Sequence, residues 1–195
     1  MQHAPWDERN GGALDTKYGL ECLSLFLSTT VLEPTKYDAI VFNFGLHDVE
    51  YNDALPEEYT PLNQYKENLE LIKQKLLATG ANIGFITSTP VPYSRAINDR
   101  VKTYNIAAEQ VMRLSEPEIK VLDLYSWVVM VCGPPPYDAC SIARERHDQP
   151  NPHYTEAGSK YLAKYVSALF HSLLNGDKII HHSIIKTSPL AMNKV

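Results

Sequence analysis

Two short segments of the chain contain a histidine beside residues that suit acid–base or oxyanion chemistry. The first is FNFGLHD at residues 42–48, in which Gly45, His47 and Asp48 follow an apolar run. A backbone N–H at a tight turn and a polar side chain beside it are the groups that form an oxyanion hole. The simpler alternative is that His47 caps the turn and Asp48 binds amides of the loop.

The second segment is PNPHYTEAG at residues 150–158. It places His153 in a loop with two prolines, two residues before Thr155, the expected cap of a helix. Because imidazole titrates near neutral pH and a rigid loop can hold it in place, His153 is a candidate general base. The alternative is an ordinary solvated loop histidine, since the chain has seven histidines.

A third segment, NGGALDTKYG at residues 10–19, has paired glycines, Gly11 and Gly12, ahead of an expected helix. Their backbone amides are candidates for binding an anion or an oxyanion. A plain turn is the alternative. The segment is not a phosphate-binding loop, because no Gly-Lys-Ser/Thr follows it.

The apolar pattern of the remaining chain predicts strands and helices that alternate. Strands are expected at residues 38–44, 82–90 and 120–124, and helices at about 17–29, from Thr60 (the capping hydroxyl) to Gly80, at 97–114, and from Thr155 to Phe170. Helices of this length between strands imply a mostly parallel sheet with helices on both faces. The prediction is therefore an α/β fold with three layers, whose site lies just beyond the carboxyl ends of the strands.

Length and composition set the class of protein. A chain of 195 residues with 44% hydrophobic residues forms one domain, which we place at 1–174, followed by a C-terminal tail at 175–195. The net charge of -5 argues against nucleic acid as a partner. No apolar run is long enough to span a bilayer, and residues 1–8 do not resemble a signal peptide.

The three cysteines do not have the spacing of a zinc site, and no metal is expected. Cys132 and Cys140 flank the loop CGPPPYDAC, whose prolines and glycine favour a turn. The ends of such a loop can approach to the 4.4–6.8 Å, roughly, that a disulfide needs between Cα atoms. The alternative is two free thiols. A disulfide would indicate an oxidising compartment.

Taken together, these segments resemble the SGNH (GDSL-type) hydrolase family over roughly residues 3–174. Gly11 or Gly12 matches the family's oxyanion glycine, the Gly45–Asp48 turn matches its Gly-x-Asn-Asp block, and His153 matches its catalytic histidine, followed by Tyr154, Thr155 and Gly158. The resemblance implies a flavodoxin-like α/β/α sandwich and a metal-independent esterase without a cofactor.

The resemblance also implies a substrate class, namely acetyl or short acyl esters of carbohydrates or small molecules. Tyr93, Tyr137 and Trp127 are expected near the mouth of the site, where an aromatic ring can stack on a sugar, although core packing is the simpler role for Trp127. The acyl group, the alcohol and the oligomeric state are not assigned.

The sequence departs from the family pattern at two positions of the site. The family's asparagine is replaced by His47, whose imidazole can still donate an N–H. The family's aspartate, three residues before the histidine, is replaced by Pro150. Asn151 and Asp148 are equal alternatives for the residue that orients His153.

The third departure concerns the nucleophile, because no Gly-Asp-Ser occurs in the chain. The favoured interpretation is an N-terminally incomplete esterase that lacks its first strand and its serine, and that is inactive in this form. It would be secreted or luminal if the missing part carried a signal peptide, and cytoplasmic otherwise. The alternative is a pseudo-hydrolase that binds a glycan or an acyl ligand.

Overall fold

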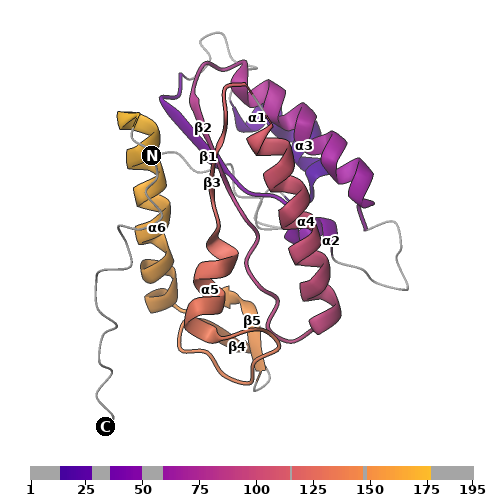
Figure 1. Ribbon diagram of the computed structural model, residues 1–195, viewed down its shortest axis with the longest axis vertical. Coiled ribbons are helices and arrows are strands. Elements are labelled where there is room, and N and C mark those ends of the chain that lie inside the picture. Colours follow the sequence, from indigo (N-terminus) through magenta and orange to yellow (C-terminus); the bar gives the residue numbers. More distant parts are fainter. Residues whose placement is uncertain (1–13, 28–35, 50–58, 115, 147–148, 177–195) are drawn as a thin grey trace.

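A parallel sheet of three strands forms the centre of the described structure. The computed structural model describes residues 14–27, 36–49, 59–114, 116–146 and 149–176. The strands are β1 (Ala39–Phe42), β2 (Asn82–Ile86) and β3 (Lys120–Leu122), in the order β1-β2-β3. Ile40 pairs with Ile83, and Phe85 with Val121. All three carboxyl ends therefore point to the same edge of the sheet (Figure 1).

Helices cover both faces of this sheet. Helix α6 (Glu156–Asn175) packs across all three strands, while α3 (Leu62–Leu77) contacts β2 and α4 (Arg95–Arg113) contacts β3. Helix α1 (Thr16–Phe26) packs on α3. Figure 1 shows α6 on one side and α1, α3 and α4 on the other. The three-layer α/β fold predicted from the sequence is confirmed.

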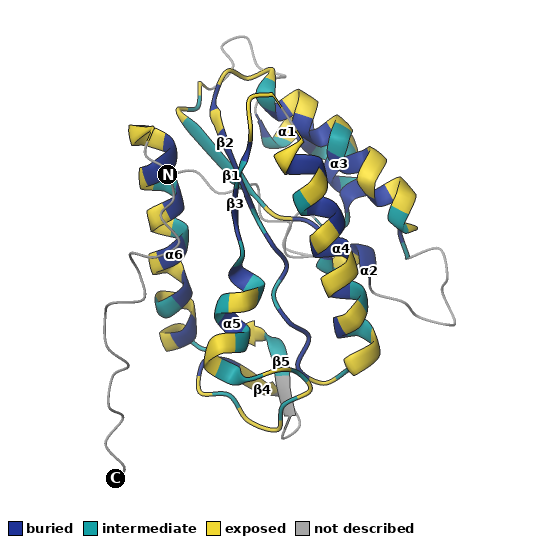
Figure 2. Ribbon diagram, viewed as in Figure 1, coloured by how far each residue is buried: buried dark blue, intermediate teal, exposed yellow. Residues whose placement is uncertain are grey.

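The sheet separates two apolar clusters of buried residues. Figure 2 shows the buried parts of the helix ribbons, in dark blue, mainly on the sides that face the sheet. One cluster lies against α3 and α4 and includes Phe85, Leu69 and Ile72, all at 0% exposure. The other lies against α6 and includes Leu162, Leu169 and Leu173. Because strand side chains alternate between faces, Phe85 and its neighbour Ile86 contribute to different clusters.

The ends of the elements differ from the sequence prediction in ways that affect the site. Thr155 caps α6, as predicted, because its hydroxyl accepts from the Gly158 amide at 3.0 Å. The predicted capping role of Thr60 is wrong: Pro61 is the N-cap of α3, and the Thr60 hydroxyl binds Asp48 instead. The strand expected to reach residue 124 ends at Leu122, because Asp123 caps another helix.

Three further elements were not predicted from the sequence. They are α2 (Leu46–Val49), α5 (Leu124–Cys132) and a hairpin of β4 (Ala143–Arg146) and β5 (Gln149–Tyr154). Helix α2 follows β1 and α5 follows β3, so both begin at the carboxyl edge of the sheet. The tail was expected at 175–195, but Asn175 is the last residue of α6 and Gly176 is its C-cap. Residues 177–195 lie outside the described residues. No described helix is long and apolar enough to cross a membrane.

The packing of α6 on the sheet predicts a contrast between two leucines of this helix. Leu169 is 1% exposed and Leu174 is 54% exposed. Leu169→Ala should lower the free energy of unfolding by about 2–5 kcal/mol, because it removes buried methyl groups and leaves a cavity. Leu174→Ala should change it by less than about 0.5 kcal/mol. Urea denaturation measures both, and equal losses would contradict this placement of α6.

Candidate active site

The turn that follows β1 is fixed by groups from two other elements. Tyr65, on α3, donates its hydroxyl to the Phe44 carbonyl at 3.0 Å, and Ser88, just after β2, donates to the same oxygen at 3.4 Å. Gly45 has φ +140, and a Cβ there would lie 2.9 Å from Ser88 Oγ and 3.1 Å from Tyr65 Oη. Both the backbone conformation and the close approach therefore require glycine.

The loop after β2 is held just as closely. Asn105, on α4, accepts from the Ser88 amide at 2.9 Å and donates to the Ser88 carbonyl at 2.8 Å. Asn43 donates to the Ile86 carbonyl at 2.7 Å, which links the ends of β1 and β2. The two loops at this edge therefore form one hydrogen-bonded unit. Tyr65, Ser88 and Asn105 were not predicted to have roles here, because nothing in the local sequence indicates these long-range partners.

His47 and Asp48 lie side by side on α2 but in opposite environments. His47 is exposed, whereas Asp48 is completely buried. The Asp48 carboxylate accepts from the Thr16 amide at 3.0 and 3.2 Å, from the Thr16 hydroxyl at 2.5 Å, and from the Thr60 hydroxyl. Asn68 of α3 donates in turn to the Thr16 hydroxyl at 3.1 Å. Asp48, expected only as a supporting loop residue, therefore joins α1, α2 and α3.

Burial is the main influence on the ionisation of Asp48. Removal from water raises the pKa of its carboxyl above the ordinary value of 3.8, the bonds from Thr16 and Thr60 lower it in part, and the nearby Asp15 raises it. The donors around the carboxylate therefore offset only part of the cost of burying its charge.

The glycine segment connects to this buried group through the residues that follow it. Gly11 and Gly12 themselves lie outside the described residues. Asp15 caps α1 by accepting from the Tyr18 amide at 2.8 Å, and the next residue is Thr16, the partner of Asp48. Thr16, which makes this buried contact with the turn of His47, is thus only four residues after Gly12 in the sequence.

His153 lies in β5 rather than in the loop that the sequence predicts. Pro150 and Pro152 are compatible with a strand here, because β5 pairs with β4 alone and needs no second row of amide donors. The pairing shifts between Ala143↔Tyr154 and Glu145↔Pro150, so the residues 151–153 face a single residue of β4. Bulges of this kind redirect side chains.

The bulge brings Asn151 onto the ring of His153. The His153 amide donates to Asn151 Oδ1 at 2.8 Å, and His153 Nδ1 lies 3.2 Å from the same oxygen. An amide oxygen only accepts, so this ring contact is a hydrogen bond when Nδ1 carries the proton. Nε2 of the exposed His153 makes no hydrogen bond to any residue in the described ranges. Asp148, the other expected orienting residue, lies outside the described residues.

The hairpin is attached to the carboxyl edge of the sheet through Tyr154. Burial raises the pKa of Tyr154, and a hydrogen bond to Thr89, just after β2, lowers it in part. Figure 1 shows β4 and β5 below the ends of the strands, beside α5. The segments of His47 and His153 therefore both lie at this edge.

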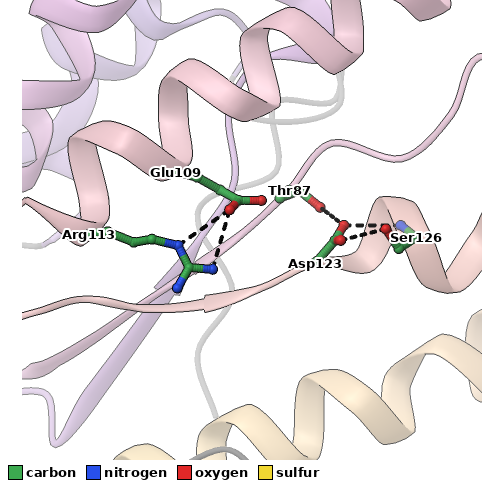
Figure 3. Close-up of polar contacts among 5 residues, drawn as sticks. All are labelled: Thr87, Glu109, Arg113, Asp123 and Ser126. Carbon is green, nitrogen blue, oxygen red and sulfur yellow. Dashed lines mark hydrogen bonds and ion pairs between the residues drawn. The ribbon is translucent and has the colours of Figure 1, made fainter. Parts of the chain in front are cut away.

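Asp123, directly after β3, is the N-cap of α5. Figure 3 shows Asp123 between Thr87 and Ser126. Its carboxylate accepts from the Ser126 amide at 3.0 Å, which caps α5, and from the Ser126 hydroxyl at 2.5 Å. The Glu109–Arg113 pair in the same view is an exposed pair within α4.

Cys132 and Cys140 are joined by a disulfide with Cα atoms 5.0 Å apart.

The three aromatic residues expected near the mouth have different surroundings. Trp127 stacks on Tyr165 of α6 with ring centroids 4.2 Å apart, so one face of its ring is covered. Tyr137 is half-buried and donates its amide to the Pro92 carbonyl at 3.1 Å, whereas Tyr93 is 47% exposed. No group of three or more potential metal ligands occurs in the part of the chain that the structure describes.

No protein-family model and no curated protein matches the chain. Solved structures do resemble it. A catalytic mutant of an acetylxylan esterase from Geobacillus stearothermophilus has a TM-score of 0.64 at 16% identity, with 81% of this chain and 68% of that chain covered. An acetyl xylan esterase has a TM-score of 0.63 at 14% identity, covering 80% and 76%.

An α/β hydrolase from the metagenome of Lake Arreo, Spain, has a TM-score of 0.62 at 15% identity, covering 83% of this chain and 70% of that chain. At these identities the likeness shows the fold. The chain therefore has an α/β fold of the kind that ester hydrolases use.

The buried contacts of Asp48 predict the effect of removing its carboxylate. Asp48→Ala leaves the Thr16 amide and two hydroxyls without their acceptor, which should cost about 2–4 kcal/mol of unfolding free energy. Asp48→Asn keeps one acceptor and should cost less. Asp99→Ala is the matched control, because the side chain of Asp99 is 62% exposed, and it should change stability by less than about 0.5 kcal/mol. Chemical denaturation at pH 7 compares all three.

The pH dependence of the same variants reports the ionisation of Asp48. Because the folded protein raises this pKa above 3.8, it holds the proton where the unfolded chain has lost it. The stability that Asp48 contributes is therefore greatest below about pH 4 and falls as the pH rises through the folded pKa. Asparagine does not titrate, so the destabilisation by Asp48→Asn should shrink between pH 4 and pH 7. A difference that grows with pH would contradict this assignment.

Proposed function

We propose that this chain carries the general base and the oxyanion turn of an SGNH-type carboxylic ester hydrolase. The observation that supports this most is the contact of Asn151 Oδ1 with His153 Nδ1 at 3.2 Å. A proton on Nδ1 leaves the lone pair on Nε2, the form of imidazole that accepts a proton from a nucleophile. The likeness of the fold to that of acetylxylan esterases adds to this support.

In the proposed reaction, a serine hydroxyl attacks the ester carbonyl while His153 Nε2 takes its proton. The same imidazole then returns the proton to the leaving alcohol, and water hydrolyses the acyl-serine by the reverse roles. His47 and the amide of Gly11 or Gly12 donate to the tetrahedral oxyanion, each contributing about 3–4 kcal/mol. No metal or cofactor takes part.

The serine is the component that residues 1–195 do not supply. Their sequence contains no Gly-Asp-Ser. In the Geobacillus stearothermophilus esterase, catalytic mutants replace a serine, an aspartate or a histidine, and the aspartate is three residues before the histidine. We propose that a segment preceding these residues provides the serine, that residues 1–195 alone are inactive, and that Asn151 replaces the aspartate.

The substrates that we propose are O-acetyl or short acyl esters, with acetylated carbohydrates first. This choice follows from the acetylxylan esterases among the structural neighbours. The exposed ring of Tyr93 and the half-buried ring of Tyr137 are candidate contacts for a sugar.

Acetate release from acetylated xylooligosaccharides tests the proposed roles. Residues 1–195 should release no acetate above background, and the chain extended by its Gly-Asp-Ser segment should be active. In the extended chain, His153→Ala should lower kcat by about 10⁴-fold or more. Asn151→Ala should lower kcat less, with little change in KM.

His171→Ala is the matched control, because His171 is an exposed histidine near the far end of α6. It should leave kcat unchanged. Full activity from residues 1–195 would mean that another nucleophile operates. An extended chain that binds acetylated oligosaccharide without hydrolysing it would support a binding module in place of an esterase.

A further inference from the structure

The strand of His153 has little support from its own sheet. Strands β4 and β5 form a sheet of two strands, interrupted by the bulge at residues 151–153. A hairpin of two strands is at best marginally stable by itself in water. Its conformation therefore depends on the segments attached to the N-terminal end of β4 and to the C-terminal end of β5.

The C-terminal end of β5 is joined to α6. The Thr155 amide donates to the Ile142 carbonyl at 2.9 Å. A Cβ at Gly158, in the first turn of α6, would lie only 2.2 Å from this carbonyl oxygen, so the helix packs directly on the residue before β4. This attachment fixes where β5 ends, immediately after His153 and Tyr154.

The N-terminal end of β4, which lies beside the C-terminal end of β5, is joined to the loop between Cys132 and Cys140. The Ala143 amide donates to the Cys140 carbonyl at 3.1 Å, and Ala143 pairs with Tyr154. Cys140 is bonded to Cys132, the last residue of α5. The disulfide therefore links α5, which begins at the edge of the sheet, to the residue whose carbonyl binds the first amide of β4.

The same loop is also hydrogen-bonded to the loop that follows β2, through Tyr137. Tyr137 lies between the two cysteines. Burial is the main cause that raises the pKa of Tyr154 in β5, and the nearby Tyr137 raises it further. Burial and Tyr125 raise the pKa of Tyr137 to about 12. The Tyr137 amide donates to the Pro92 carbonyl in the loop after β2. Closing the loop at its two cysteines thus limits the positions open to Tyr137.

We propose that the Cys132–Cys140 disulfide is a positioning element, which holds the bulged strand where the ring of His153 meets Asn151. The inference rests on the proposed function for what His153 does there. Its test measures the position of the ring and not the reaction, so the two proposals can fail separately.

Dithiothreitol opens the disulfide in the test. It transfers two electrons and two protons to the S–S bond, which becomes two thiols, while the reagent closes to its own cyclic disulfide. A thiol count on the denatured chain should find only Cys22 before treatment and all three cysteines afterwards. Three thiols in the untreated protein would overturn the proposal.

Hydrogen exchange then locates the effect of reduction. Amides of β4 and β5 should exchange roughly tenfold faster or more, since the loop gains the chain freedom that the cross-link had removed. Amides of β1, β2 and β3 should keep their rates. Unchanged exchange in the hairpin would overturn the proposal. An equal loss of protection in all five strands would also overturn it, because the disulfide would then stabilise the whole fold and not the hairpin in particular.

The ¹⁵N spectrum of the imidazoles supplies a readout that a purely structural role would not change. His153, assigned by comparison with His153→Gln, should show the Nδ1–H tautomer in the oxidised protein. After reduction the signal should shift toward the tautomer mixture of a free imidazole. A tautomer that is the same in both states would overturn the proposal.

Two cysteine variants separate the disulfide from the reagent. Cys132→Ser with Cys140→Ser should reproduce the reduced state without dithiothreitol. Cys22→Ser, which keeps the disulfide, should match the oxidised wild type and respond to the reagent as it does. A double variant that keeps the oxidised exchange rates and tautomer would overturn the proposal.

Discussion

The carboxylate of Asp48, fully buried beside an exposed histidine, is the constraint on which this edge of the molecule depends. A charge removed from water is stable only where donors surround it. Here the donors come from Thr16 at the start of α1 and from Thr60 just before α3. The carboxylate therefore specifies how three segments far apart in the sequence meet, and with them the direction in which the turn of His47 leaves the sheet.

The two halves of the candidate site are held in place by different interactions. The His47 half is fixed from inside the domain, by Asp48 and by the hydroxyls of Tyr65 and Ser88 on the Phe44 carbonyl. The His153 half is a hairpin outside the main sheet, held by α6 at the C-terminal end of β5 and by the Cys132–Cys140 loop at the N-terminal end of β4. Elements with few buried apolar contacts open locally at a lower cost than core strands. The hairpin is such an element.

The parts of this structure that follow local rules could be predicted from the sequence. The apolar runs and helical stripes give β1, β2, β3, α3, α4 and α6, and the Thr155 cap precedes α6 as predicted. The predictions are wrong where the local structure depends on a group that is distant in the sequence. Thr60 has the sequence of a cap, but a buried carboxylate binds its hydroxyl. The two prolines near His153 indicate a loop, but a strand with one neighbour accepts them. The Asp-x-x-Ser pattern at residues 123–126 was the available signal for α5.

An amide in place of a carboxylate limits what Asn151 can contribute to the proposed base. Its oxygen accepts from Nδ1 of His153 and so fixes the tautomer and the direction of Nε2, but it carries no negative charge to stabilise an imidazolium. Orientation is then the whole of its contribution. Orientation in turn depends on the bulge that brings residues 151 and 153 together and on the hairpin in which that bulge lies. A site with a neutral orienting residue therefore depends more on the rigidity of its backbone than one with an aspartate.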